Sequence, residues 1–303
     1  MLCHAISGFL TITMGVMGIQ LPNPTGRYPV GTVSLELIDD SRIGPFASTH
    51  RPRDIMISVF YPTSETAVKS GNYSVAPDHP YDALITEYPN GDVVSMPTSV
   101  LDDFPSKMPS LVEVRVGDVE FIASALKNSS TLSQIPGLNS SGTPLRSDQI
   151  GIFGHSLGGA TAAQAVSNST TFPCGANFDG GIFGPVAQLG LNKPFLQIGA
   201  QDHNQTTDTT FAAFWDHLHG FRREFIVNGT VHLAFTDVPI LRDLLGEAFP
   251  AQQKNQSGTI AGEALLEIET ALIDTFFAFC LKGKSVDDLD ILARGRFPEV
   301  SVP

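Results

Sequence analysis

Cysteine is scarce in this sequence, and so are charged residues. Three cysteines occur among 303 residues, and the chain has no CxxC pair, no HExxH motif and no glycine-rich phosphate-binding loop. We therefore expect no metal and no organic cofactor. Charged residues make up 16% of the chain, the formal net charge is -13, and no basic cluster offsets it. Because an acidic surface repels phosphate backbones, we expect no nucleic-acid partner.

A membrane-spanning segment is also lacking. The apolar or small residues from Ala5 to Ile19 form a stretch too short to cross a bilayer, and no Lys or Arg precedes Arg27. Residues 1–20 are instead typical of a secretory signal peptide, which leaves residues 21–303 as a single domain. We therefore expect a secreted protein without stable membrane insertion.

Glycosylation acceptors of the N-x-S/T type support secretion, because several of them are spread along the chain. They begin at Asn72, Asn128, Asn139, Asn168, Asn204, Asn228 and Asn255. Cys3 would leave with the signal peptide, so that Cys174 and Cys280 remain. These two form either one disulfide or two unrelated buried thiols, and the sequence favours neither.

Short β-branched runs alternate with helical stretches, which predicts a largely parallel sheet with crossover helices. The expected strands are Val30–Ile38, Ile55–Tyr61, Gln149–Phe153, Gly175–Phe178, Pro194–Ile198 and, as the last one, Glu224–Val227. The expected helices are Val112–Leu126, Gly158–Val166, Thr209–His219 and Glu263–Leu281, and residues 128–147 are expected to form a polar loop. The first two strands are expected to pair as an antiparallel hairpin.

The segment Gln149–Gly159 holds a G-x-S-x-G motif centred on Ser156. A buried strand precedes the motif and an alanine-rich helix follows it, which is the setting of a nucleophilic serine in α/β-hydrolases. Gly154 and Gly158 lack the Cβ atoms that would clash in so tight a turn. The N–H of Leu157, at the start of the helix, is expected to stabilise a developing oxyanion.

A serine nucleophile needs an acid and a base, which follow it in that order in this fold. His232 is the expected base because it lies in the loop just after the last expected strand, and His203 is the second candidate. Two strand ends offer an acid, Asp179 and Asp202. Residue patterns alone do not decide which of the two is the catalytic acid.

Several blocks of the sequence resemble the platelet-activating factor acetylhydrolase-like lipases of fungi and bacteria. The most specific are GHSLGG at 154–159 and GTVHLAFTD at 229–237. They are joined by CGANFD at 174–179, RYPVG at 27–31, FYP at 60–62 and DHPYD at 78–82. The resemblance implies a calcium-independent serine esterase of the α/β-hydrolase fold. It also implies that the acid follows the strand directly after the elbow helix, which selects Asp179 over Asp202.

The chain departs from that family between Tyr61 and Asp78. Family members carry a further strand and helix here, and the loop after that strand donates a second N–H to the oxyanion. The intervening segment is too short to hold these elements. The expected fold is therefore an α/β-hydrolase with a mostly parallel central sheet flanked by helices, lacking this strand–helix unit. Loss of one oxyanion donor typically costs about a hundred- to a thousandfold in rate.

The expected function is hydrolysis of short-chain acyl esters, in a small-molecule or lipid substrate, by an acyl-enzyme mechanism using Ser156, His232 and Asp179. One alternative is a broad carboxylesterase or polyester hydrolase with Asp202 as its acid. The other is an inactive, truncated protein with a hydrolase fold, for which the missing segment is the argument.

Overall fold

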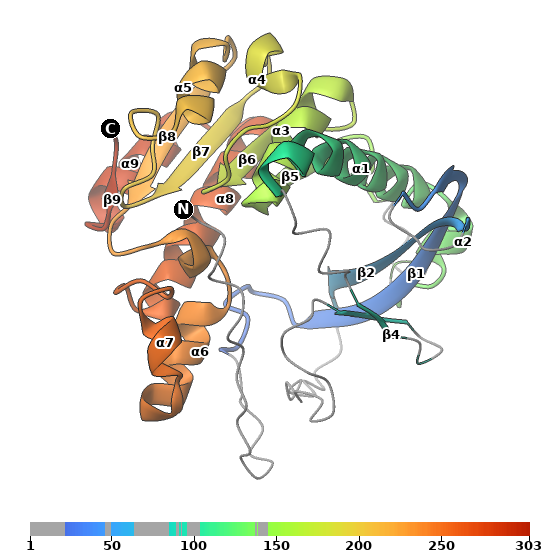
Figure 1. The fold of residues 1–303 in the computed structure, drawn as a ribbon, viewed down its shortest axis with the longest axis horizontal. Helices are drawn as coiled ribbons and strands as arrows, with labels where there is room; N and C mark the ends of the chain where they lie inside the picture. Colours follow the sequence, from blue (N-terminus) through green and yellow to red (C-terminus); the bar gives the residue numbers. More distant parts are fainter. Residues whose placement is uncertain are drawn as a thin grey trace. The chain divides into compact units, whose positions relative to one another are not determined.

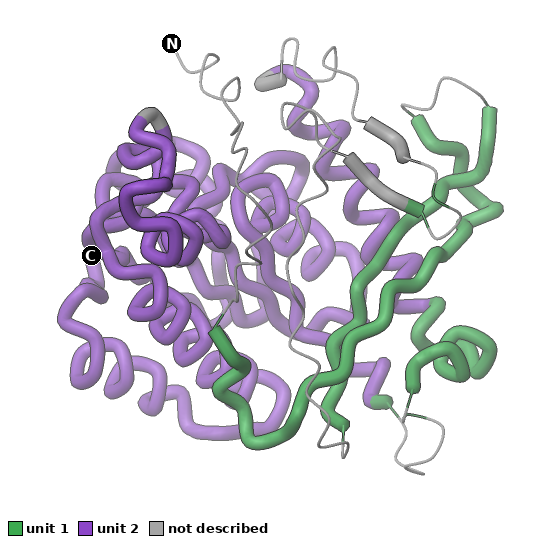
Figure 2. The backbone as a smooth tube through the Cα atoms, turned by 90° about the horizontal axis from the view of Figure 1, so that it is seen from below, with its two compact units in different colours: residues 1–104, 125–145 green, residues 105–124, 146–303 purple. Residues whose placement is uncertain are grey.

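A computed structural model describes residues 22–45, 50–63, 85–88, 91, 93–95, 104–136, 138 and 145–303. The chain divides into two compact units, residues 1–104 with 125–145 and residues 105–124 with 146–303, drawn in green and purple in Figure 2. The expected signal peptide and most of the segment between Tyr61 and Asp78 lie outside the described residues. A single domain over residues 21–303 stays a prediction.

The first unit contains the expected antiparallel hairpin. Strand β1 (Val30–Ile43) pairs with β2 (Pro52–Pro62) in continuous register from Val30 opposite Pro62 to Asp39 opposite Arg53. Side chains of β1 alternate between exposed and covered positions, as they do in a strand with one buried face. A second short antiparallel pair joins β3 (Ile85–Glu87) to β4 (Val93–Ser95).

The second unit is built on a five-stranded sheet in the order β5-β6-β7-β8-β9 (Figure 1). The strands are β5 (Gly151–His155), β6 (Cys174–Phe178), β7 (Phe195–Ala200), β8 (Arg222–Val227) and β9 (Val300–Ser301). The first four run parallel and β9 is antiparallel. Every residue of β6 and β7 is buried, which explains their mostly apolar sequences. Within the described part of the chain, β5 pairs with β6 alone.

Helices cover both faces of this sheet and create two hydrophobic clusters. One cluster packs the strands against α8 (Gly262–Lys282) and α9 (Asp287–Arg296). The other packs them against α1 (Phe104–Ala125), α3 (Leu157–Asn168) and α5 (Thr209–Asp216). The expectation of a mostly parallel sheet flanked by helices is confirmed. No described helix has the length and apolar character needed to cross a membrane.

Several element predictions need correction. Helix α1 begins at Phe104, earlier than Val112, and the expected polar loop contains the short helix α2 (Ser129–Leu132). Strand β8 is not the last strand, because the chain returns after α9 to add β9 at the sheet edge. The short elements α4 (Val186–Leu189), η2 (His232–Phe235), α6 (Val238–Leu245), η3 (Gly246–Ala248) and α7 (Ala251–Lys254) have no counterpart among the predictions.

The two remaining cysteines form a disulfide. Cys174 at the start of β6 is bonded to Cys280 near the end of α8. Of the two alternatives that the sequence left open, the structure contains the disulfide. It joins the strand that ends at Asp179 to the long helix covering one face of the sheet.

Candidate active site

Ser156 lies in the sharp turn between β5 and α3, in a strained backbone conformation with φ 56° and ψ -125°. Its N–H donates to the carbonyl of Phe178 at 2.9 Å, which ties the turn to the end of β6. A Cβ on Gly154 would overlap the backbone of Gly158, so the expected need for glycine at 154 is confirmed. At Gly158 the expected clash is not found, because a Cβ there would have no atom within 4 Å apart from the backbone of its own helix.

His232 begins η2 in the loop after β8 and reaches Ser156 from there. Its Nε2 lies 3.0 Å from the Ser156 Oγ, the distance of a hydrogen bond that the hydroxyl donates. Its Nδ1 lies 2.7 Å from Oδ2 of Asp179 and donates to it. The structure therefore brings the three expected side chains into one hydrogen-bonded chain.

Asp179 follows β6 directly and is 2% exposed. Like Ser156 it has a positive φ, here 54°. Its Oδ1 accepts from the Ala200 N–H at 2.6 Å and from Nδ1 of His203 at 2.7 Å, while Oδ2 accepts from His232. Burial alone would raise the pKa of this carboxyl, but the hydrogen bonds from His203, His232 and Ala200 lower the pKa overall.

Comparison with known proteins places these residues in a family. The family model of platelet-activating factor acetylhydrolase, isoform II, matches residues 123–279, just over half of the chain, a range that includes Ser156, Asp179 and His232. The chain belongs to this acetylhydrolase family. A probable 1-alkyl-2-acetylglycerophosphocholine esterase of Arthroderma benhamiae is 29% identical over 262 residues, covering 80% of this chain. The chain spans only 62% of that relative's length.

The fold of the acetylhydrolase-family chain also has a solved counterpart. A ferulic acid esterase from Streptomyces cinnamoneus superposes with a TM-score of 0.73 at 24% sequence identity, covering 94% of this chain and 99% of that one. At that identity the likeness concerns the fold, which is that of an α/β-hydrolase.

His155 is a site residue that the sequence analysis missed, although it lies inside the G-x-S-x-G motif of this family member. Its ring lies 4.6 Å from the ring of His232, and its Nε2 donates to the backbone carbonyl of His232 at 2.8 Å. Burial, and secondly electrostatic repulsion by the neighbouring His232, lower the pKa of His155 to about 4. His155 is therefore neutral at pH 7 and fixes the loop of the base without adding charge.

Asn177 is a second missed residue, and it is fully buried in β6. Its side-chain amide donates to the carbonyl of Gly180 at 2.7 Å and to Oε1 of Gln197 at 2.9 Å, while its Oδ1 accepts from the Gly180 N–H at 3.0 Å. These bonds close the turn that begins at Asp179. A polar residue inside the otherwise apolar run of β6 was the available signal.

The remaining sequence candidates take other positions. Asp202 is exposed in the turn after β7, where its backbone carbonyl accepts from Thr207. The carboxylate bonded to His232 is Asp179, so the geometry favours the acid that the resemblance selected. His203 does not take the place of the base at Ser156, since its ring bonds to Asp179 and to Asp208.

Leu157 is the first residue of α3, where the N–H groups of a helix have no partner within the helix. This places its N–H beside Ser156, as an oxyanion donor requires. Among the described residues, no three His, Cys, Asp or Glu side chains are grouped as metal ligands would be.

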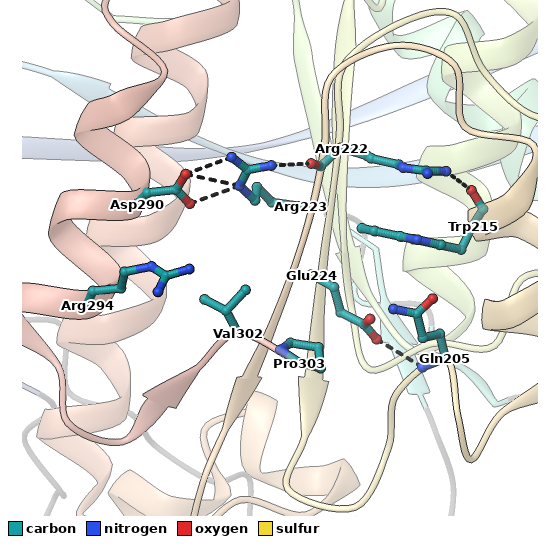
Figure 3. A pocket seen from close by; sticks show the side chains of 9 residues that line it. All are labelled: Gln205, Trp215, Arg222, Arg223, Glu224, Asp290, Arg294, Val302 and Pro303. Atoms are coloured by element: carbon teal, nitrogen blue, oxygen red, sulfur yellow. Dashed lines mark hydrogen bonds and ion pairs between the residues drawn. The ribbon is translucent and has the colours of Figure 1, made fainter.

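A cavity of about 320 Å³ lies elsewhere in the second unit, beside the first half of β8 (Figure 3). It is bordered by Trp215, Glu224 and the ion pair of Arg223 with Asp290. Ser156, Asp179 and His232 do not line it. The cavity is therefore separate from the candidate active site.

Proposed function

We propose that this chain is a serine esterase in which Ser156 is the nucleophile, His232 the general base and Asp179 the acid that orients it. One observation carries the proposal. The two nitrogens of His232 lie 3.0 Å from the Ser156 hydroxyl and 2.7 Å from the Asp179 carboxylate, so a proton can leave Oγ as the imidazolium is stabilised.

The reaction is acyl transfer in two steps. Oγ of Ser156 attacks the ester carbonyl while Nε2 of His232 takes the proton of the serine hydroxyl. The Leu157 N–H donates a hydrogen bond to the carbonyl oxygen, on which negative charge develops. His232 then gives this proton to the leaving alcohol, and the C–O bond of the ester breaks. A water molecule attacks the acyl-enzyme in the same way and releases the acid.

The substrate class we propose is a short-chain acyl ester, of the kind carried at the second position of an acetylated glycerophosphocholine. Membership of the acetylhydrolase family supports this choice, as does the similarity to the probable 1-alkyl-2-acetylglycerophosphocholine esterase of Arthroderma benhamiae. We expect hydrolysis to fall steeply as the acyl chain lengthens.

The first experiment measures hydrolysis of p-nitrophenyl acetate and of 2-acetyl and 2-palmitoyl glycerophosphocholines by the purified chain. Ser156→Ala is expected to abolish turnover, while Asp179→Asn should lower kcat by about 10⁴-fold because the imidazole loses its preferred tautomer. Asp202→Asn is the matched control and should keep parental activity. A collapse of activity in Asp202→Asn alone would favour the broad carboxylesterase with Asp202 as its acid.

An inactive protein is the other alternative. A folded parent chain that hydrolyses none of these esters would refute the proposed activity and support that alternative. A parent chain that hydrolyses the long-chain ester as fast as the acetyl ester would refute the proposed acyl preference while leaving the proposed triad in place.

We also propose that the protein is secreted and glycosylated. Disulfides such as Cys174–Cys280 persist mainly in oxidising compartments. Four glycosylation acceptors are exposed, namely Asn128, Asn168, Asn228 and Asn255. In contrast, Asn204 is half-buried and its Oδ1 accepts from the N–H and hydroxyl of Thr206.

Expression with the native N-terminus in a eukaryotic host tests this. The protein should appear in the medium and lose mass on endoglycosidase treatment. Asn255→Gln should remove one glycan, whereas Asn204→Gln, the control, should leave the mass unchanged. Retention in the cytosol without glycans would contradict the proposal.

A further inference from the structure

His203 lies between two carboxylates, one of which is Asp179. Its Nδ1 lies 2.7 Å from Oδ1 of Asp179, and its Nε2 lies 2.8 Å from Oδ2 of Asp208. Asp208 in turn accepts from the N–H groups of Thr210 and Phe211 and so caps α5. A continuous chain of contacts therefore runs from a helix N-terminus through His203 to the carboxylate that orients His232.

The loop that carries His203 is held rigidly. The His203 N–H donates to the Ala200 carbonyl at 2.9 Å, and a Cβ at Gly199 would overlap the His203 carbonyl, so only glycine allows this approach. The Gln205 N–H donates to the buried carboxylate of Glu224 at 3.0 Å. The His203 ring also packs on the buried ring of Phe211, with 4.6 Å between the ring centres. These contacts hold the imidazole between the two carboxylates.

This position also defines the charge of His203. A carboxylate only accepts, so both ring nitrogens must carry a proton, which makes the ring an imidazolium. Burial would lower the pKa of His203, but the hydrogen bonds and charges of Asp179 and Asp208 raise it to about 9. The ionisable groups that face the ring are therefore Asp179 from β6, Asp208 from the start of α5 and, at longer range, Glu224 from β8.

We propose that His203 is a positioning residue, a cation held in place by Asp208 that fixes the Asp179 carboxylate against which His232 is oriented. This inference rests on the proposed function. Without His203, Oδ1 of Asp179 would keep one donor, the Ala200 N–H, and the carboxylate would be held by two hydrogen bonds in place of three. The cation also adds a positive charge at Oδ1 of the carboxylate whose Oδ2 accepts from His232.

The expected consequence is a shift of the acid limb of kcat/KM, which reports the pKa of the free enzyme's base. In His203→Asn the side-chain amide still reaches Asp179 near the former Nδ1, but the positive charge is lost. The acid limb should then move up by about one pH unit, because a positive charge near the catalytic pair has been removed. A purely structural role for His203 would lower kcat without moving this limb.

Asp208→Asn separates charge from contact. Asn keeps the helix cap, and its amide can donate to an unprotonated Nε2, so that His203 becomes neutral while staying bonded to Asp179. Because this variant removes the anion as well as the cation, the acid limb should rise by less than in His203→Asn. Asp216→Asn, an exposed carboxylate at the other end of α5, is the charge control and should leave the limb unchanged.

A second readout is independent of turnover. The ring nitrogens are followed by NMR on the parent and on His203→Asn as the pH is raised. His203 should remain charged beyond pH 8 in the parent, and its signals should be missing from the variant. A neutral His203 at pH 7 in the parent, or an acid limb that is the same in the parent and in His203→Asn, overturns the positioning role. If the parent hydrolyses no ester, the proposed function fails and this titration alone decides the role of His203.

Discussion

Loss of the disulfide between Cys174 and Cys280 should destabilise the folded chain strongly. The bond links residues 106 apart in sequence, so it closes a long loop in the unfolded chain. Loop-closure entropy for about 100 residues stabilises the folded state by about 4.7 kcal/mol. Cys174 is fully buried, and alanine is the replacement that leaves no unpartnered hydroxyl behind.

The assay is urea unfolding of the parent and of the double variant Cys174→Ala/Cys280→Ala, followed by circular dichroism. We expect the free energy of unfolding to fall by about 4 kcal/mol and the unfolded, unreduced parent, prepared with residues 1–20 still attached, to titrate as having one thiol, Cys3. Three thiols in the parent, or a loss below about 1 kcal/mol, would refute the reasoning. Reduction of the parent should reproduce the stability of the double variant.

Two further predictions concern Asn177, which is fully buried, and Glu269, which is half-buried. Asn177→Ala leaves the Gly180 N–H and Oε1 of Gln197 without their partner. We therefore expect the free energy of unfolding, measured in urea, to fall by about 3 kcal/mol, and esterase activity to fall as well. Unchanged values would contradict the role of Asn177 in closing the turn. Burial, and then the charge of Asp237, raise the pKa of Glu269 from 4.5 to about 8. The unfolded chain therefore loses this proton first, and stability falls as the pH rises through this range. Glu269→Gln should raise the unfolding midpoint above that of the parent at pH 8.5 but not at pH 4. If the variant and the parent have the same midpoint at pH 8.5, this reasoning is refuted.

The parts of the site that sequence could predict are those encoded locally. Gly154, the preceding strand and the following helix of small residues predict the turn at Ser156 from a few neighbouring residues, and the structure has that turn. Likewise, β6 and β7 are fully buried, so their apolar runs carry a strong signal. The two-residue strand β9 has no such pattern, because it depends on α9 returning the chain to the edge of β8.

The choice of acid shows where local patterns stop. Asp179 and Asp202 both follow buried strands, and their order along the chain satisfies the same rule. The difference arises in three dimensions: Asp179 has a positive φ and is buried beside His232, whereas Asp202 is exposed. His203 is a similar case. Its bonds reach 24 residues back and five residues forward, a pairing that no short motif encodes.

Ser156 and Asp179 share a feature that explains how the site is held before substrate arrives. Both have a positive φ, which costs roughly 1–3 kcal/mol at each residue and persists only where the surroundings dictate it. Those surroundings are shared. The Ser156 N–H donates to the Phe178 carbonyl, the Asp179 N–H donates to the Ile198 carbonyl at 2.7 Å, and a Cβ at Gly180 would overlap the Ser156 carbonyl. Because one set of contacts holds the nucleophile and the acid together, substitutions at the two turns should not be additive.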